Sequence, residues 1–149
     1  MVVAFFGHAD ASSDIYPSLE RKVMDLSEQN ENITFLVGTN GSFDCMARQA
    51  LKQALKRFPH IRCYVVLAYY NPEDKESIEQ YGLPTLFPGS APPRYAIDYR
   101  NNYMVKECDA VICYITHTWG GAWKFVHKAE RQGKMIINLA KRESVILPM

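Results

Sequence analysis

The segment VVAFFGHADASSDIYPSLERKVMDLSEQNENITFLVG, residues 2–38, decides the fold class. It opens with an unbroken apolar run, Val2 to Phe6, and closes with another, Ile33 to Val37, and each run is followed directly by a glycine. Between the runs, Ser13 or Asp14 can cap a helix, and apolar residues recur at helical spacing. A strand, a helix and a second strand, with apolar runs instead of alternation, indicate a parallel sheet that helices cover on both faces.

The same pattern continues along the chain. Further strands are expected at residues 62–68, 109–115 and 134–139, and further helices at 43–58, 95–107 and 122–129. Residues 69–94 contain five prolines and are expected to form a long loop with a short helix near 73–81, while 140–149 are expected to add a short edge strand. Five strands with right-handed crossovers predict an α/β fold, a Rossmann-like, doubly wound and mostly parallel sheet flanked by helices, as a single domain over residues 1–149.

The composition is that of an ordinary globular chain. Of its 149 residues 48% are apolar and 22% are charged, with a formal net charge of +1. A charge near zero gives no global basic field, so nucleic acid is not expected as a partner, although a local patch stays open. No stretch reaches the roughly 18 apolar residues of a membrane span and no basic leader precedes the first strand, which predicts a cytoplasmic protein without membrane contact.

The four cysteines form no C-x-x-C pair and no zinc-finger spacing with histidine. We therefore expect reduced, buried thiols, and neither a metal nor a cofactor.

Three predicted strands end in turns rich in glycine and hydroxyl residues, and a parallel sheet brings such turns to one edge. Glycine lets the backbone approach a ligand, and the first turn of a helix offers unpaired N–H groups, so the edge favours an anion such as phosphate. Each turn alone is also explained as a tight connection. The predicted ligand-binding residues of these turns are Gly7 and His8; Gly38, Thr39, Asn40, Gly41, Ser42 and Asp44; and Thr116, Thr118, Trp119, Gly120, Gly121 and Ala122.

Arg100 is the most informative single residue. It shares one face of a predicted helix with Ile97 and Met104, so Arg100 and Met104 are expected on the packed side, next to the ligand. A buried guanidinium needs a partner. That partner is either a carboxylate, such as Asp98 or Asp109, or a phosphate group held by a bidentate clamp.

Several side chains of the turns have two interpretations. His8 and His117 are either hydrogen-bonding loop histidines or proton-transfer groups. Asp44 is either a carboxylate favoured at a helix start or a ligand for ribose hydroxyls. Trp119 and Trp123 either stack on a base or pack in the core. The candidates for catalysis are Arg100, His8 and Asp44.

Neither G-x-G-x-x-G nor G-x-x-x-x-G-K-[ST] occurs. The segments RNNYMVKECDAVI, residues 100–112, and TWGGA, residues 118–122, instead resemble the SLOG superfamily, which includes the DprA proteins and the LOG-type cytokinin phosphoribohydrolases, once labelled lysine decarboxylases. The turns FGH, residues 6–8, and GTNGSFDCMA, residues 38–47, resemble most the small YpsA-like branch. The resemblance spans almost the whole chain and implies a nucleotide pocket and a homodimer.

The chain departs from the LOG enzymes at one functional position. Their glycine loop ends in a glutamate that supports cleavage of the N-glycosidic bond, whereas Phe125 stands here, and the proline that opens their loop is missing. A phenyl ring cannot act as acid, base or cation stabiliser. The LOG reaction would therefore need another carboxylate, such as Asp44 or Glu130.

The leading prediction is a sensor or binding module for a phosphate-bearing nucleotide or a nucleotide-derived ligand at the carboxyl edge of the sheet. The alternatives are a hydrolase or transferase that acts on the N-glycosidic bond of nucleoside monophosphates, and an interaction protein whose site is vestigial.

Overall fold

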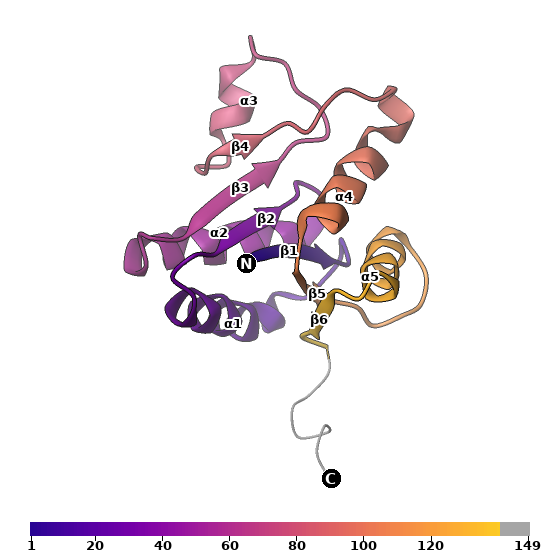
Figure 1. Cartoon of the computed structure of the whole chain (residues 1–149). Coiled ribbons are helices and arrows are strands. Elements are labelled where there is room, and N and C mark those ends of the chain that lie inside the picture. Colours follow the sequence, from indigo (N-terminus) through magenta and orange to yellow (C-terminus); the bar gives the residue numbers. More distant parts are fainter. Residues whose placement is uncertain (141–149) are drawn as a thin grey trace.

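A computed structural model gives the structure of the chain, which is described for residues 1–140. Within them the strands form a six-stranded sheet in the order β4-β3-β2-β1-β5-β6, and each neighbouring pair is parallel (Figure 1). The strands are β1 (Val2–Gly7), β2 (Thr34–Val37), β3 (Arg62–Val66), β4 (Thr85–Leu86), β5 (Ala110–Tyr114) and β6 (Met135–Asn138).

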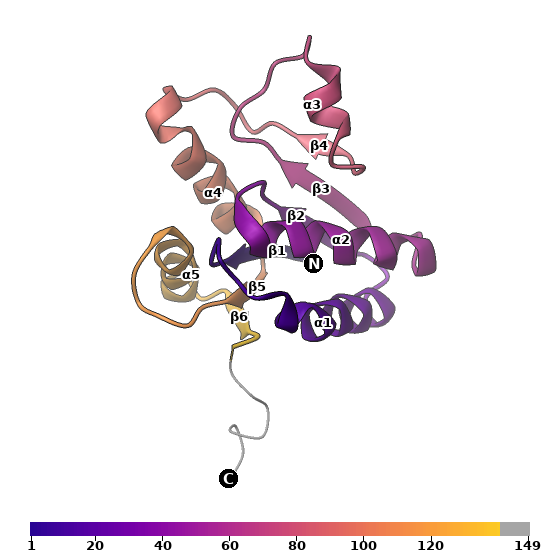
Figure 2. The ribbon, with the colours of Figure 1, turned by 180° about the vertical axis from the view of Figure 1, so that it is seen from behind.

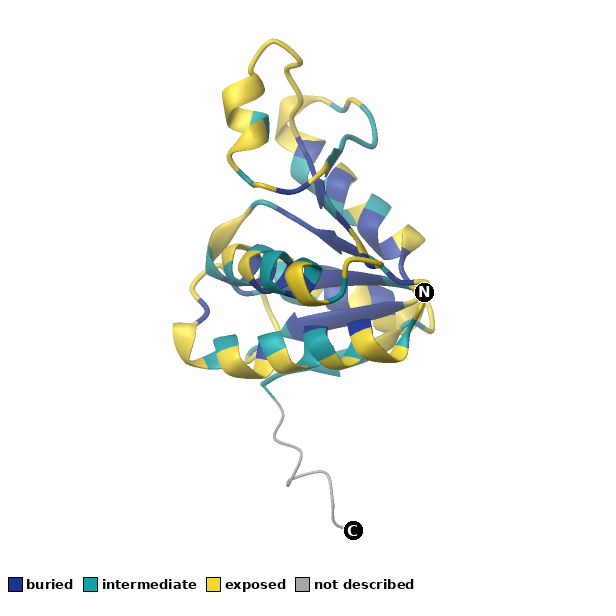
Figure 3. Ribbon diagram, turned by 90° about the vertical axis from the view of Figure 1, so that its left-hand side faces the viewer, coloured by how far each residue is buried: buried dark blue, intermediate teal, exposed yellow. Residues whose placement is uncertain are grey.

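Helices cover both faces of this sheet, which confirms the predicted doubly wound architecture. They are α1 (Tyr16–Gln29), α2 (Gly41–Arg57), α3 (Lys75–Glu79), α4 (Ala96–Glu107) and α5 (Gly121–Arg131), with 3-10 turns at Ser13–Ile15 and Pro93–Tyr95. Helices α1 and α2 lie on one face, and α4 and α5 lie on the other (Figures 1 and 2). Two hydrophobic clusters fill the spaces between helices and sheet, so the central strands β1, β2 and β5 are the most buried part of the molecule (Figure 3).

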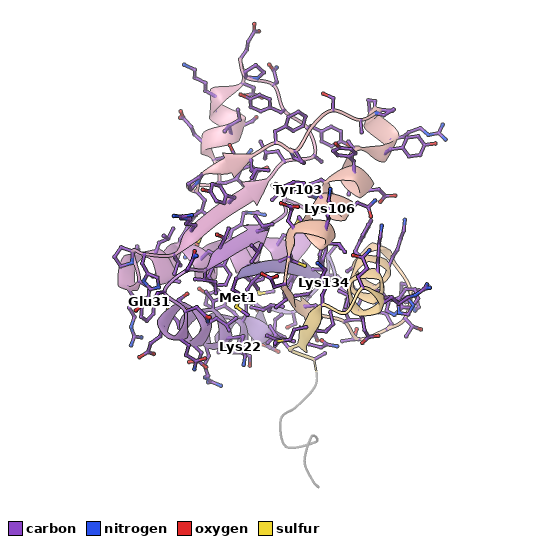
Figure 4. The ribbon with its side chains drawn as sticks, in the orientation of Figure 1. Met1, Lys22, Glu31, Tyr103, Lys106 and Lys134 are labelled. Atoms are coloured by element: carbon purple, nitrogen blue, oxygen red, sulfur yellow. The ribbon has the colours of Figure 1, made fainter. Side chains whose placement is uncertain are left out.

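Local sequence explains where the helices begin and end. Pro17 lies in the first turn of α1, where its missing N–H costs nothing. Helix α2 ends at Arg57, before Pro59. Lys134 donates hydrogen bonds to the carbonyl oxygens of Lys106 at 3.3 Å and Cys108 at 2.7 Å, and so caps the end of α4 (Figure 4).

The sequence prediction of about five strands missed β4. This strand has two residues and pairs at the sheet edge through backbone bonds of 2.8 Å from Val65 to Pro84 and from Leu67 to Leu86. A strand of two residues is too short to show a periodic pattern of apolar residues, so this part of the chain was expected to be a loop. The helix cap also differs by one residue, because Ser12 caps the 3-10 turn that precedes α1.

The edge strand expected in the tail lies outside the described residues, apart from Ala140. None of the helices within residues 1–140 is long and apolar enough to cross a membrane.

The chain changes direction across the sheet at β1. Strands β1 to β4 extend one way, and α4 then returns the chain to β5, on the other side of β1. Gly7, the last residue of β1, lies opposite Tyr114, the last residue of β5. Loops that leave two adjacent strands toward opposite faces open a crevice, and such switch points hold the ligands of α/β sheets.

Candidate functional site

A pocket of about 340 Å³ lies at this switch point, beyond the carboxyl ends of β1 and β5. Its walls come from four parts of the chain that are distant in sequence: residues 5–10, 38–44, 97–104 and 117–122. The volume falls within the range of about 300–1,000 Å³ that is usual for small-molecule sites. The fold therefore assembles one concave site from the three predicted turns and the predicted arginine helix.

Arg100 forms part of the pocket wall from α4. Only 1% of its surface is exposed, although it lines the pocket. Its Nη1 donates to the carbonyl oxygen of Val66 at 3.0 Å and to Oγ1 of Thr39 at 3.3 Å, and its Nε donates to Oδ1 of Asn101 at 2.7 Å. These partners are neutral, so they fix the guanidinium without cancelling its charge.

No carboxylate within residues 1–140 forms an ion pair with Arg100. Asp98 pairs with Lys124 at 3.3 Å on the surface, and Asp109 accepts a hydrogen bond of 2.8 Å from the backbone of Val2. Burial lowers the pKa of Arg100, against the opposing charge of Asp44. Within residues 1–140 Arg100 therefore has no direct ion pair, neither with Asp98 nor with Asp109, and Asp44 acts on its charge only at longer range.

Gly38 leaves room for two ionisable side chains, Asp44 and Arg100, beside the end of β2. A Cβ at this position would lie 2.8 Å from Oδ2 of Asp44 and 3.2 Å from Cζ of Arg100. Asp44 is buried, and its Oδ2 accepts a hydrogen bond of 3.0 Å from the backbone N–H of Asn40. Burial raises the pKa of Asp44 to about 6, against that hydrogen bond and the charges of Arg100 and Arg48. The pocket thus holds a carboxyl group that changes its charge near neutral pH.

Three aromatic rings are stacked at one side of the pocket. The ring centroids of His8 and His117 lie 3.8 Å apart at 13°, and those of His117 and Trp119 lie 3.6 Å apart at 16°. Nε2 of His8 accepts a hydrogen bond of 2.9 Å from the backbone N–H of Thr116. A neutral imidazole that accepts at Nε2 carries its proton on Nδ1. Burial and the charge of His117 lower the pKa of His8, which favours this neutral form.

The amino end of α5 completes the wall. Gly120 has a φ of +93° and precedes the helix, and no side chain caps that end. Gly120, Gly121 and Ala122 line the pocket, and a Cβ at Gly121 would meet no atom within 4 Å. Unpaired N–H groups in a first helical turn carry a partial positive charge, so this end adds to the field of Arg100.

The structure brings together most of the predicted site residues. Lining the pocket are Gly7, His8, Gly38, Asn40, Asp44, Arg100, Met104, Trp119, Gly120, Gly121 and Ala122.

Five predicted residues do not line this pocket. Thr39 accepts a hydrogen bond from Arg100, Gly41 lies against Ala9, and Ser42 donates a hydrogen bond to the carbonyl oxygen of Ala11. Thr116 and Thr118 line a second cavity of about 280 Å³, together with Trp123 and His127.

Sequence reasoning missed some lining residues, among them Asp10 and Asn101. Asn101 follows Arg100 directly and holds its Nε, a neighbour effect that helical spacing does not reveal.

Phe125 is part of the core. Its ring lies 6.0 Å from that of Phe6 at 18°, and 1% of its surface is exposed. The position of the LOG glutamate is therefore filled by a packing residue. No group of three His, Cys, Asp or Glu side chains suited to a metal ion occurs in the part of the chain that the structure describes.

Comparisons with known proteins connect the chain to others through its fold. No protein-family model matches it, and no curated protein sequence matches it. The structure of DNA processing protein A (DprA) from Streptococcus pneumoniae superposes with a TM-score of 0.67 at 19% identity, over 90% of this chain and 48% of that one. DprA from Helicobacter pylori gives a TM-score of 0.70 at 15% identity, over 96% of this chain and 66% of that one, so the chain spans only part of either protein.

The Helicobacter pylori structure is described for its single-stranded DNA binding mode. The expectation that nucleic acid is not a partner, which was based on the net charge, is therefore wrong, because a protein with this fold binds single-stranded DNA. Net charge averages over the whole surface and does not report a local site. The likeness shows the fold: the chain has the Rossmann-like fold found in the DprA proteins.

Proposed function

We propose that the switch-point pocket binds a phosphate-bearing nucleotide, with Arg100 as the anchor for the phosphate group. One observation carries this proposal: a guanidinium that is 99% buried lines the pocket with no carboxylate in ion-pair distance among residues 1–140. A buried cation of this kind is costly unless an anion joins it. Phosphate suits it because Nη2 of Arg100, which forms no hydrogen bond within residues 1–140, keeps N–H donors for phosphate oxygens.

Two further features support a nucleotide over a bare phosphate ion. The pocket, at about 340 Å³, is much larger than one phosphate group, and its walls combine charged, backbone and aromatic groups. Its place at the switch point is where doubly wound sheets hold nucleotides. The amino end of α5 supplies a second attraction for negative charge.

Isothermal titration calorimetry with AMP, ADP and inorganic phosphate tests the proposal. We expect AMP to bind, and Arg100→Met to weaken it by about tenfold or more, as for a lost hydrogen bond to a charged group. Arg57→Met is the matched control, since Arg57 is exposed at the far end of α2. Circular dichroism verifies that both variants fold. The proposal is wrong if no nucleotide binds, or if Arg100→Met and Arg57→Met bind AMP equally well.

Cleavage of an N-glycosidic bond is the second candidate, favoured by Asp44. Burial raises the pKa of its carboxyl group to about 6, close to the value that suits a proton-transfer group at neutral pH. Phe125 cannot take part, so Asp44 would replace the missing glutamate. Chromatographic detection of free base from nucleoside monophosphates, lost in Asp44→Asn, tests this candidate, and the absence of base release rules it out.

Single-stranded nucleic acid is the third candidate. Besides the fold shared with DprA, Lys124, Lys128 and Arg131 line a groove of about 540 Å³ along α5. Fluorescence polarisation with a labelled oligothymidylate, in low and high salt, measures this binding.

The homodimer, the cytoplasmic location, the single domain and the YpsA-like branch stay predictions. Size-exclusion chromatography with light scattering tests the homodimer.

A further inference from the structure

The stack of His8, His117 and Trp119 at the pocket ends in an exposed ring face. Trp119 is the outermost ring, and 67% of its surface is accessible, although it lines the pocket. Single exposed aromatic residues are common and need no explanation. Trp119 differs from such residues because one face of its indole ring is stacked on the ring of His117.

The innermost ring, that of His8, is held by contacts with the backbone. The backbone N–H of His8 donates to the carbonyl oxygen of Tyr114 at 3.3 Å, and its Nε2 accepts from the N–H of Thr116 at 2.9 Å. His117 lies between His8 and Trp119, and its ring is nearly parallel to both of theirs, at 13° and 16°. The indole plane is therefore oriented before a ligand arrives, which reduces the entropy cost of stacking another ring on it.

We propose that the free face of Trp119 is a stacking site for the nucleobase of a ligand whose phosphate group is held by Arg100. This inference rests on the proposed function and adds the base subsite to it. Every nucleobase offers a π-face, so an indole platform favours nucleotides over sugar phosphates without selecting one base. Because Trp119 and Arg100 line the same pocket, one mononucleotide can occupy both subsites.

The test compares AMP with ribose 5-phosphate, which carries the phosphate and lacks the base. Stacking on an aromatic side chain corresponds to an affinity gain of about 5- to 150-fold. We expect AMP to bind more tightly than ribose 5-phosphate by a factor in this range. Trp119→Ala should bring AMP to the level of ribose 5-phosphate and leave the affinity for ribose 5-phosphate unchanged, whereas Trp119→Phe should keep most of the preference.

A second measurement uses fluorescence. The chain contains two tryptophans, so Trp123→Phe leaves Trp119 as the sole indole. Trp123 stacks on His127 at the second cavity, and its replacement should not change AMP affinity. In this background AMP should quench the emission and ribose 5-phosphate should not.

The outcomes separate the two proposals. If AMP and ribose 5-phosphate bind equally and both depend on Arg100, the stacking site is wrong and the phosphate site stands. If Trp119→Ala weakens both ligands equally, Trp119 only supports the loop, and the stacking site is again wrong. If neither ligand binds, the proposed function fails, and the base subsite fails with it.

Discussion

Replacing Asp44 by asparagine should make the protein more stable at neutral pH. The side chain is buried beside Gly38, and its Oδ2 accepts a hydrogen bond of 3.0 Å from the N–H of Asn40. An amide oxygen in the same place can accept that bond. Asp44→Asn therefore keeps the shape and the hydrogen bond of the site and removes only the charge.

The magnitude follows from the pKa. Burial raises the pKa of Asp44 from 3.8 to about 6. At about 1.4 kcal/mol for each pKa unit, ionising this carboxyl group costs the folded state about 3 kcal/mol. Between pH 3.8 and about 6 the folded state holds a proton that the unfolded state has released, so stability falls as the pH rises through this window. Above the window the full cost remains.

Urea unfolding of both proteins at low and neutral pH measures the effect. The difference in unfolding free energy should be near zero at about pH 4 and should reach about 3 kcal/mol in favour of Asp44→Asn at pH 7.5. Asp98→Asn is the control: its surface ion pair with Lys124 should contribute less than about 1 kcal/mol. A difference that does not change with pH, or a variant less stable than the wild type at pH 7.5, refutes the reasoning.

Three other substitutions test the environment of the pocket. Gly38→Ala should destabilise the fold by about 1–3 kcal/mol in urea and weaken AMP binding, because its Cβ would lie 2.8 Å from Oδ2 of Asp44. Phe125→Ala should cost about 3–5 kcal/mol by the same assay, as for a core residue stacked on Phe6. Burial lowers the pKa of His8 from 6.5, so thermal stability should fall as the pH drops below 6.5, and His8→Gln should flatten this dependence if the histidine causes it.

Most of the fold could be predicted because most of its strands can be recognised directly in the sequence. A central parallel strand is buried on both faces, so β1 and β5 appear as unbroken apolar runs between helical patterns. Strand β4 could not be found in this way. It is an edge strand of two residues, held partly by the carbonyl oxygen of Pro84, which no side-chain pattern encodes.

The glycine turns and Arg100 could be predicted from spacing, but the side of a loop that faces the pocket could not. Thr116 and Thr118 line the second cavity, while Trp119, next in the chain, lines the main pocket. These hydroxyl and aromatic residues are adjacent in the sequence, and adjacency in a loop does not determine the direction in which each side chain points. The stack of His8 on His117 depends in the same way on contact between β1 and the loop after β5, more than a hundred residues apart.

The location of the charges links the stability of this protein to its proposed role. A buried guanidinium and a buried carboxyl group flank Gly38 without an ion pair, an arrangement that costs folding energy compared with apolar residues of similar size. Burial by itself does not offset that cost, whereas the anion proposed to bind at Arg100 would offset it. The formal net charge of +1 does not report this local field, because it sums all the charges of the chain. The partner of this fold is therefore better inferred from one unpaired cation at the switch point than from the sum of all charges.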